Sequence, residues 1–223
     1  MAVQFDLSKL DPMDCYKLLA GLIVPRPIAL VTSVAADGKR NAAPFSFFNM
    51  FGHEPPIIAL GIENRDSTTP KDTKQNIRDS GEFVVNVVDE VTAEQMNICA
   101  IDFPTGEDEL SLARFTSAPA LLINGSLIVE SPASLECRLT QEIMINQDGK
   151  RSIFLGEVLL VHVREGIVDE RMHVDQAQLN LIGRTAGDNY VRTRDRFQMP
   201  RIRYHNYSTP AASAKPLIGR KEQ

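Results

Sequence analysis

The stretch RDSTTPKDT, residues 65–73, combines positive charge with hydroxyl groups in a way that suits an anion. Thr69 is expected to cap a helix over residues 69–81, with Pro70 at the first helical position and Asp72 three residues after the cap. The unpaired N–H groups and positive dipole end of such a helix favour a phosphate. The stretch therefore predicts a phosphate site, while a well-capped surface helix with solubilising charges is the plainer interpretation. Two cations and four hydroxyl side chains would serve the phosphate: Arg65, Lys71, Ser67, Thr68, Thr69 and Thr73.

A second stretch, NAAPFSFFNM at residues 41–50, mixes aromatic, amide and small side chains in an unusual order for a strand. A half-buried strand would alternate apolar with charged residues, and a buried strand would be richer in valine and isoleucine. The composition favours a surface that holds a flat, mostly apolar molecule with a hydrogen-bonding edge. The apolar groups are Phe45, Phe47 and Phe48, and the polar groups are Asn41, Ser46 and Asn49.

One ligand, riboflavin phosphate (FMN), would account for both stretches, because it joins a flat tricyclic ring to a polyol chain and a phosphate. The phenylalanines would supply apolar walls for the ring, and the amide and hydroxyl side chains would meet its polar edge. Residues 65–73 would take the phosphate. Two carboxylates, Asp66 and Asp72, complicate this hypothesis, since they would have to face away, cap the helix or bind a polyol hydroxyl.

The elements that would position these stretches are mostly strands. Turn signals at 37–41, 124–125 and 147–150 separate the strand-like runs, and the last of these turns predicts a hairpin. The expected strands are residues 27–36, 44–51, 56–63, 82–88, 121–130, 134–146 and 151–165.

Helical pattern is scarcer. Asp11 followed by Pro12 predicts the start of a helix that ends at Gly21, and further helices are expected at 69–81 and 91–102. Many short strands without regular β-α alternation favour a mainly β fold, a barrel or a sandwich, over a parallel α/β sheet.

Composition limits the class of protein. A chain of 223 residues with 43% hydrophobic content can bury one sizeable core, and barrels of this length are often single domains. The net charge of −5 argues against a nucleic-acid surface. Cys15, Cys99 and Cys137 are odd in number and far apart, which argues against a disulfide framework or a metal site. No signal pattern or membrane-length apolar run is evident, so a cytoplasmic protein without membrane contact is expected.

The order of several motifs resembles a known family. The segments PRPIALVTS, DGKRNAAPFSFF, PP, KDT and EFVVN follow one another over roughly the first 90 residues, and LIGRTAGDNY comes later. In this order they resemble the flavin reductase-like proteins with an FMN-binding split barrel, close to the flavoredoxin-type branch. The resemblance implies a Greek-key split β-barrel, a homodimer with FMN near the subunit interface, and NAD(P)H as electron donor. One domain is expected over residues 1–205, with 206–223 as an extended tail.

The resemblance also implies a set of cofactor-binding residues. Thr32 and Ser33 would lie beside the flavin chain or phosphate, and Arg26 would have a direction fixed by its two proline neighbours. Tyr190 and Arg184 would reach the flavin or the dimer contact, or else Tyr190 packs on the barrel in a glycine loop. Ala43, Pro44, Phe45, Ser46, Phe47, Phe48 and Asn49 would border the ring, and Arg65, Ser67, Lys71, Asp72 and Thr73 the phosphate and ribityl chain.

No catalytic acid, base or nucleophile is predicted. In the reaction that the resemblance implies, hydride passes from the nicotinamide to the flavin, so the cofactor carries the chemistry. No GxGxxG follows a strand, so NAD(P)H would bind transiently across the flavin. His162 is interpreted as a strand residue and His53 as a turn residue that could instead line the nicotinamide side. His173 belongs to the site only by family analogy.

Several functions remain open. The first is an FMN-dependent oxidoreductase that transfers hydride from NAD(P)H to flavin and on to a flavin or small acceptor. The second is an FMN electron carrier reduced by a partner protein, and the third is a non-catalytic split-barrel dimer without flavin. An oxidase of related barrel shape that acts on a phosphorylated vitamin is a further alternative, which no feature of the sequence favours.

Overall fold

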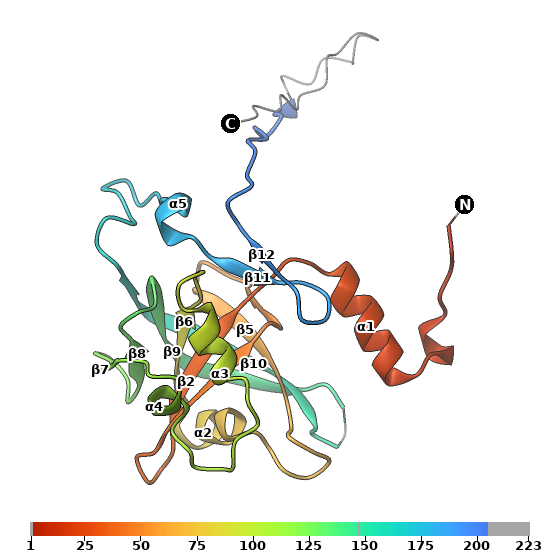
Figure 1. Ribbon diagram of the computed structural model, residues 1–223, viewed down its shortest axis with the longest axis horizontal. Helices are drawn as coiled ribbons and strands as arrows, with labels where there is room; N and C mark the ends of the chain where they lie inside the picture. Colours follow the sequence, from red (N-terminus) through yellow and green to blue (C-terminus); the bar gives the residue numbers. More distant parts are fainter. Residues whose placement is uncertain (1, 147, 205–223) are drawn as a thin grey trace.

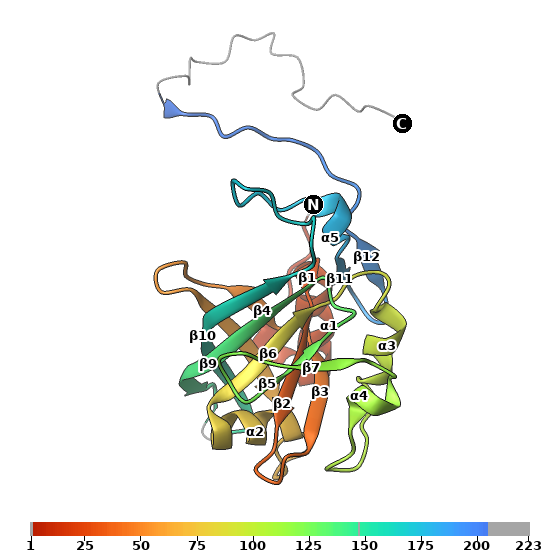
Figure 2. The same ribbon diagram turned by 90° about the vertical axis from the view of Figure 1, so that its left-hand side faces the viewer.

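The computed structural model describes residues 2–146 and 148–204, and in them the chain is mainly β (Figure 1). Seven antiparallel strands form the main sheet in the order β3-β2-β6-β9-β10-β5-β4, and the sheet curls into a split barrel (Figure 2). These strands are β2 (Ala29–Val34), β3 (Arg40–Phe45), β4 (Phe48–Met50), β5 (Ile57–Glu63), β6 (Glu82–Val87), β9 (Ala133–Met144) and β10 (Arg151–Val163).

Four neighbouring strands of this sheet form a Greek key. Strands β6, β9 and β10 lie side by side in chain order, while β5, which precedes β6, pairs with the far side of β10. The long connection from β5 to β6 contains helix α2 (Asp72–Ser80), which lies across the lower end of the barrel in Figure 1. The mainly β, Greek-key split barrel expected from the sequence is therefore confirmed.

Smaller elements surround the barrel. Helices α3 (Ala93–Ile98) and α4 (Glu109–Leu112) lie together on one side of it in Figure 2, and α1 (Pro12–Leu22) stands beside it in Figure 1. A small sheet at one end joins β1 (Arg26–Pro27), β11 (Ile182–Arg184) and β12 (Tyr190–Arg192). The remaining elements are the pair β7 (Ser117–Pro119) and β8 (Ser126–Ile128), the 3₁₀ helix Leu7–Lys9 and α5 (Gln176–Leu179).

Strand β2 is buried on both faces because it separates two cores. Its Ala29 and Val31 side chains point into the barrel, where they pack in a cluster with Phe83. On the other face, Leu30 packs in a cluster with Met96 under α3 and α4. Helices α3 and α4 are thereby packed against strands β2 and β3, which α2 also contacts.

Most of the expected elements are confirmed. Asp11 accepts a hydrogen bond from the Met13 N–H over 2.8 Å and caps α1, which runs one residue past Gly21. The β2–β3 turn places Gly38 at a φ of 84°, which suits glycine. Strands β2, β5, β6, β9 and β10 correspond to the runs expected at 27–36, 56–63, 82–88, 134–146 and 151–165.

The prediction of a single strand over residues 44–51 is wrong. The chain bends at Ser46 and Phe47, so that β3 pairs with β2 while β4 pairs with β5. Because β3 and β4 are the two edges of the main sheet, this bend carries the chain from one edge to the other. The carbonyl of Phe47 accepts a hydrogen bond from the Gly61 N–H over 2.7 Å, which fixes the bend against β5.

Two further expectations need correction. The helix expected from residue 69 begins at Asp72, and the strand expected at 121–130 is reduced to β8. Residues 121 and 122 form a loop instead, since their N–H groups donate to the buried carboxylate of Glu136 over 2.8 and 2.7 Å. Among residues 2–146 and 148–204, none of the helices has the length and apolar composition of a membrane span. The tail expected at 206–223 lies outside the described residues.

Candidate functional site

Two adjoining hollows meet where the β3–β4 bend approaches the start of α2. The larger, of about 500 Å³, lies between α1, the bend and β5, and the smaller, of about 80 Å³, lies between β3, α2 and residues 99–109. Both are lined by Pro44, Arg65, Lys71 and Asp102, so we describe them together as the cleft. The larger is also lined by Pro12, Met13, Tyr16, Phe45, Ser46, Phe47, Gly61, Glu63, Asn64 and Arg151, and the smaller by Asn41, Ala43, Asp72, Thr73, Cys99, Ala100, Ile101, Phe103 and Glu109.

The apolar wall of the larger hollow is formed at the bend. Phe47 is 45% exposed there, whereas Phe45 turns inward and packs in the barrel core. A Cβ atom at Gly61 would lie 2.9 Å from the Cβ of Phe47, so the glycine leaves room for this ring. Phe48 packs against the core, and Asn49 hydrogen-bonds to the next backbone N–H, so neither lines the cleft.

Three cations border the cleft, but two of them already have partners. The Arg65 guanidinium donates to the Phe103 carbonyl over 2.8 Å and lies 3.8 Å from the Asp72 carboxylate. The Arg151 guanidinium binds the carboxylate of Glu63. Lys71 makes no side-chain hydrogen bond or ion pair within residues 2–146 and 148–204, so its ammonium is available to an anion.

The start of α2 lies three residues later than the sequence predicts, and Asp66 explains why. Its carboxylate accepts the N–H groups of Thr68 and Thr69, each over 2.8 Å, and folds these residues into a separate turn. These hydrogen bonds lower the pKa of Asp66 to about 2. The helix begins instead after Lys71, and no side chain caps it, which leaves first-turn N–H groups without a capping acceptor.

The smaller hollow is polar at its inner end. Thr73 is buried and accepts a hydrogen bond from the Asn41 amide over 2.7 Å. Glu109 is buried too, and burial, with the neighbouring Asp72 carboxylate, raises the pKa of its carboxyl group. Burial likewise raises the pKa of the Cys99 thiol to about 12, so this cysteine is a neutral thiol and not a nucleophile at neutral pH.

Three of the expected cofactor ligands lie inside the protein. The guanidinium of Arg26 donates to the carbonyls of Ala20, Ile23 and Thr185 and to the Ser46 hydroxyl, and thus ties the end of α1 to the bend. The Thr32 hydroxyl donates to the Ser126 carbonyl, and the Ser33 hydroxyl accepts from the Asn76 amide over 3.1 Å. The structure gives all three side chains protein partners and does not bring them to the cleft.

Tyr190 and Ser67 also lie apart from the cleft. Tyr190 borders a separate hollow of about 480 Å³ between α3 and β11–β12, where the Arg184 guanidinium lies 4.6 Å from its ring centre. Ser67 is an exposed turn residue that lines neither part of the cleft. The cleft therefore gathers, from the expected set, Ala43, Pro44, Phe45, Ser46, Phe47, Arg65, Lys71, Asp72 and Thr73.

Some residues that line the cleft were not predicted from the sequence, and they lie on α1, after α3 and at the start of α4. Met13 and Tyr16 line the larger hollow, and their spacing of three residues on the expected helix was a usable signal. Asp102 and Glu109 had no such signal, because Asp102 lies outside the helices and strands, and α4, which begins at Glu109, has four residues and shows no helical period. The histidines expected outside the site, His53 and His162, line neither hollow.

The cleft presents groups that can bind a ligand. Among the described residues, no group of three or more His, Cys, Asp or Glu side chains is placed to hold a metal ion. What the cleft offers is an apolar wall at the bend, an ammonium at Lys71 and an uncapped helix start. These features match a ligand with a flat apolar part and an anionic end.

Comparison with known proteins gives similar chains, among them two of known structure. Nitrilotriacetate monooxygenase component B from Bacillus cereus is 32% identical, with a TM-score of 0.86, over 89% of this chain and 99% of that one. Pseudomonas fluorescens 2-nitrobenzoate 2-nitroreductase NbaA is 35% identical, with a TM-score of 0.84, over 95% of this chain and 100% of that one. An uncharacterized protein of Deinococcus radiodurans is 42% identical over 207 residues, which are 90% of each chain.

The family itself is shown by a match along most of the barrel. The model of the flavin reductase like domain matches residues 21–182, from the end of α1 to the start of β11. The resemblance seen in the order of the sequence motifs is thereby confirmed, and so is the mainly β split barrel that it implied. The chain belongs to the flavin reductase like domain family.

Proposed function

We propose that the protein binds one FMN in the cleft and, in the cytoplasm, passes hydride from NADH or NADPH through it to a flavin or another small acceptor. The continuity of the cleft carries the proposal. Residues of the β3–β4 bend and the first residues of α2, which the sequence linked to opposite ends of one ligand, line the same cleft. Membership of the flavin reductase like family supports the use of a flavin.

The residues of the cleft fit the parts of FMN. Pro44 and Phe47 offer an apolar wall to a flat ring, and Gly61 lets Phe47 lie close against β5. The Lys71 ammonium and the uncapped N–H groups of α2 offer charge-assisted contacts to a phosphate. When bound, the flavin would supply the redox chemistry, and the protein would supply shape, an apolar surface and positive charge.

An absorbance titration without oxygen tests the proposal. The purified protein is loaded with FMN, and NADH or NADPH is then added in separate experiments. The proposal expects a visible flavin spectrum that bleaches on reduction by at least one of the two nicotinamides. Bound FMN that neither nicotinamide reduces would favour an electron carrier, and a protein that takes up no FMN would favour a non-catalytic dimer.

Two relatives suggest which acceptors to test. One is component B of a monooxygenase, so a separate oxygenase that uses reduced flavin is a candidate consumer. The other, 35% identical, is a 2-nitrobenzoate 2-nitroreductase, so a nitroarene is the second candidate. Nicotinamide oxidation is measured with free FMN and with 2-nitrobenzoate in parallel, and product analysis identifies which acceptor is reduced.

We also propose that two copies of the chain associate through α1. Apolar side chains on this helix are 43–70% exposed in the single chain, namely Met13, Tyr16, Leu19, Leu22 and Ile23 at its end. Because Met13 and Tyr16 also line the cleft, a second copy on α1 would lie beside the flavin. Light scattering during gel filtration should give the mass of two chains for the wild type and of one chain for Leu22→Glu. A single-chain mass for the wild type would contradict the proposal.

A further inference from the structure

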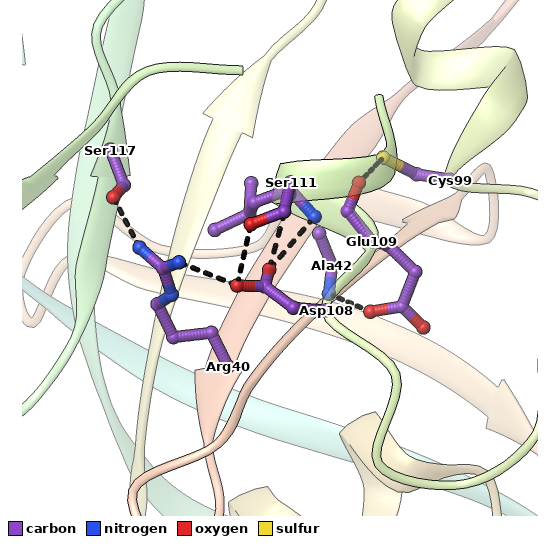
Figure 3. A network of polar contacts seen from close by, with 8 residues as sticks. Arg40, Ala42, Cys99, Asp108, Glu109, Ser111 and Ser117 are labelled. Carbon is purple, nitrogen blue, oxygen red and sulfur yellow. Dashed lines mark hydrogen bonds and ion pairs between the residues drawn. The ribbon is translucent and has the colours of Figure 1, made fainter. Parts of the chain in front are cut away.

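Glu109 occupies an unusual position at the inner end of the cleft. It is the first residue of α4, its exposed fraction is 8%, and it lines the smaller hollow. One carboxylate oxygen, Oε2, accepts a hydrogen bond from the Ala42 N–H of β3 over 2.9 Å. Figure 3 shows the other oxygen without a contact, and no side-chain or backbone donor among the described residues reaches it. A residue more than nine-tenths buried thus offers a free carboxylate oxygen to the hollow.

The surrounding network holds Glu109 in place. Asp108 caps α4 by accepting the N–H groups of Leu110 and Ser111, and it also pairs with the Arg40 guanidinium of β3 (Figure 3). Arg40 in turn donates to the Ser117 hydroxyl. Since α4 is fixed to β3 both at Asp108 and at Glu109, the free oxygen is positioned before any ligand arrives.

The charges around Glu109 favour a ligand that donates hydrogen bonds. Asp72 of α2 and Asp102 line the same hollow, Asp108 adjoins it, and the Cys99 thiol at the end of α3 is neutral. Two cations also line this hollow: Arg65 is held by Asp72 and Phe103, and Lys71 lines the larger hollow as well. A phosphate placed at Glu109 instead of at Lys71 would face these carboxyl groups, whereas a hydroxyl can donate to Glu109 whether its carboxyl group is ionised or neutral.

We propose that Glu109 accepts a hydrogen bond from a hydroxyl of the ribityl chain of the flavin, and so helps the site select flavins that carry a polyol. The inference rests on the proposed function, because it assigns a residue to the middle of the same ligand. It orders the ligand along the cleft: the ring lies at the bend, the polyol passes the smaller hollow, and the phosphate stays near Lys71.

Glu109→Gln separates this role from a structural one. The amide oxygen of the variant can keep the hydrogen bond from Ala42 N–H, because an amide NH₂ cannot accept it. The NH₂ group then replaces the free acceptor in the hollow. Affinity for riboflavin and FMN should fall about tenfold, while affinity for lumiflavin, which has a methyl group in place of the ribityl chain, should change less than about twofold.

Glu107→Gln is the matched control, since Glu107 is an exposed carboxylate of the same segment that does not line the cleft. It should leave all three affinities unchanged. A measurement on the wild type alone keeps the test independent of folding: riboflavin should bind at least about tenfold more tightly than lumiflavin.

The outcomes distinguish the two proposals. A wild type that binds none of the three flavins contradicts the proposed function, and the role of Glu109 with it. A wild type that binds riboflavin and lumiflavin equally well contradicts only the role of Glu109. Three results for Glu109→Gln would also contradict only the role of Glu109: equal losses of affinity for riboflavin and lumiflavin, no loss of affinity for any flavin, or a loss of affinity for FMN alone. The last result would place the phosphate at Glu109.

Discussion

The ammonium of Lys74 donates a hydrogen bond to the side-chain oxygen of Asn64 over 2.9 Å, although the Lys74 side chain is fully buried. The same ammonium donates to the Gly149 carbonyl over 2.8 Å in the β9–β10 turn. One lysine thus joins α2 to the end of β5 and to the hairpin. Asn64 lines the cleft, so Lys74 holds a cleft residue in place although it does not line the cleft itself.

Lys74→Met should lower the free energy of unfolding by about 1–3 kcal/mol, because the Asn64 and Gly149 oxygens lose their charged donor. Chemical denaturation measures the change. Lys71→Met is the matched control, since this lysine has no side-chain partner among the described residues, and its stability should shift by less than about 0.5 kcal/mol. Equal effects of the two substitutions would refute the role given to Lys74.

Lys71→Ala should weaken FMN binding about tenfold and leave riboflavin binding unchanged, because only the phosphate contact is lost. Isothermal titration of both flavins measures the difference. Arg65→Ala should weaken FMN binding too, and it should also lower stability, because Asp72 and the Phe103 carbonyl lose their partner. Lys39→Ala, on the β2–β3 turn, is the control. FMN affinity that survives both cleft substitutions would place the phosphate elsewhere.

Gly61→Ala should disturb the bend that carries Phe47. The new Cβ atom would lie 2.9 Å from the Phe47 Cβ, so the stability should fall by about 1–3 kcal/mol and flavin affinity should fall with it. Gly21→Ala in α1 serves as the control, since its Cβ would meet Ala186 at an ordinary 3.7 Å. That substitution should raise stability by about 0.5–1 kcal/mol. If Gly61→Ala behaved like Gly21→Ala, the close approach of Phe47 would not matter.

The buried Glu109 should make stability depend on pH. Burial and the Asp72 and Asp108 carboxylates raise the pKa of Glu109 above its ordinary value of 4.5. Between the two pKa values the folded chain holds a proton that the unfolded chain has released, so stability falls as the pH rises through this window. Glu109→Gln removes this contribution, and its stability relative to the wild type should increase with pH from 4.5 upwards. Denaturation at several pH values measures the trend, and a pH-independent difference would refute it.

The sequence could predict the cleft only in part, for physical reasons that differ between residues. The alternation of side chains along a strand does not tell which of two buried faces borders a cofactor. Strand β2 is buried on both faces, so Thr32 and Ser33, which point to opposite faces, fitted a cofactor role equally well. The bend at Ser46 and Phe47 depends on pairing with β5, a contact between segments that local pattern does not record. The sequence could not decide whether Thr69 would cap the helix or Asp66 would fold a separate turn, since both residue types suit a turn.

Residues far apart in the chain were the hardest to place. Arg26 was expected to have a fixed direction, and it has one, but its four acceptors come from α1, the bend and the segment before β12. Glu109 reaches the cleft because α4 packs on β3, which is a tertiary contact. The family resemblance, by contrast, was readable because the motif order lies in the sequence itself, and the family match confirms it.

The most direct test is a crystal structure of the protein saturated with FMN. We predict one FMN in the cleft, with its ring beside Pro44 and Phe47, its ribityl chain beside Glu109 and its phosphate within hydrogen-bond reach of Lys71. An FMN bound instead in the hollow beside Tyr190, or a cleft that stays empty at saturation, would contradict it.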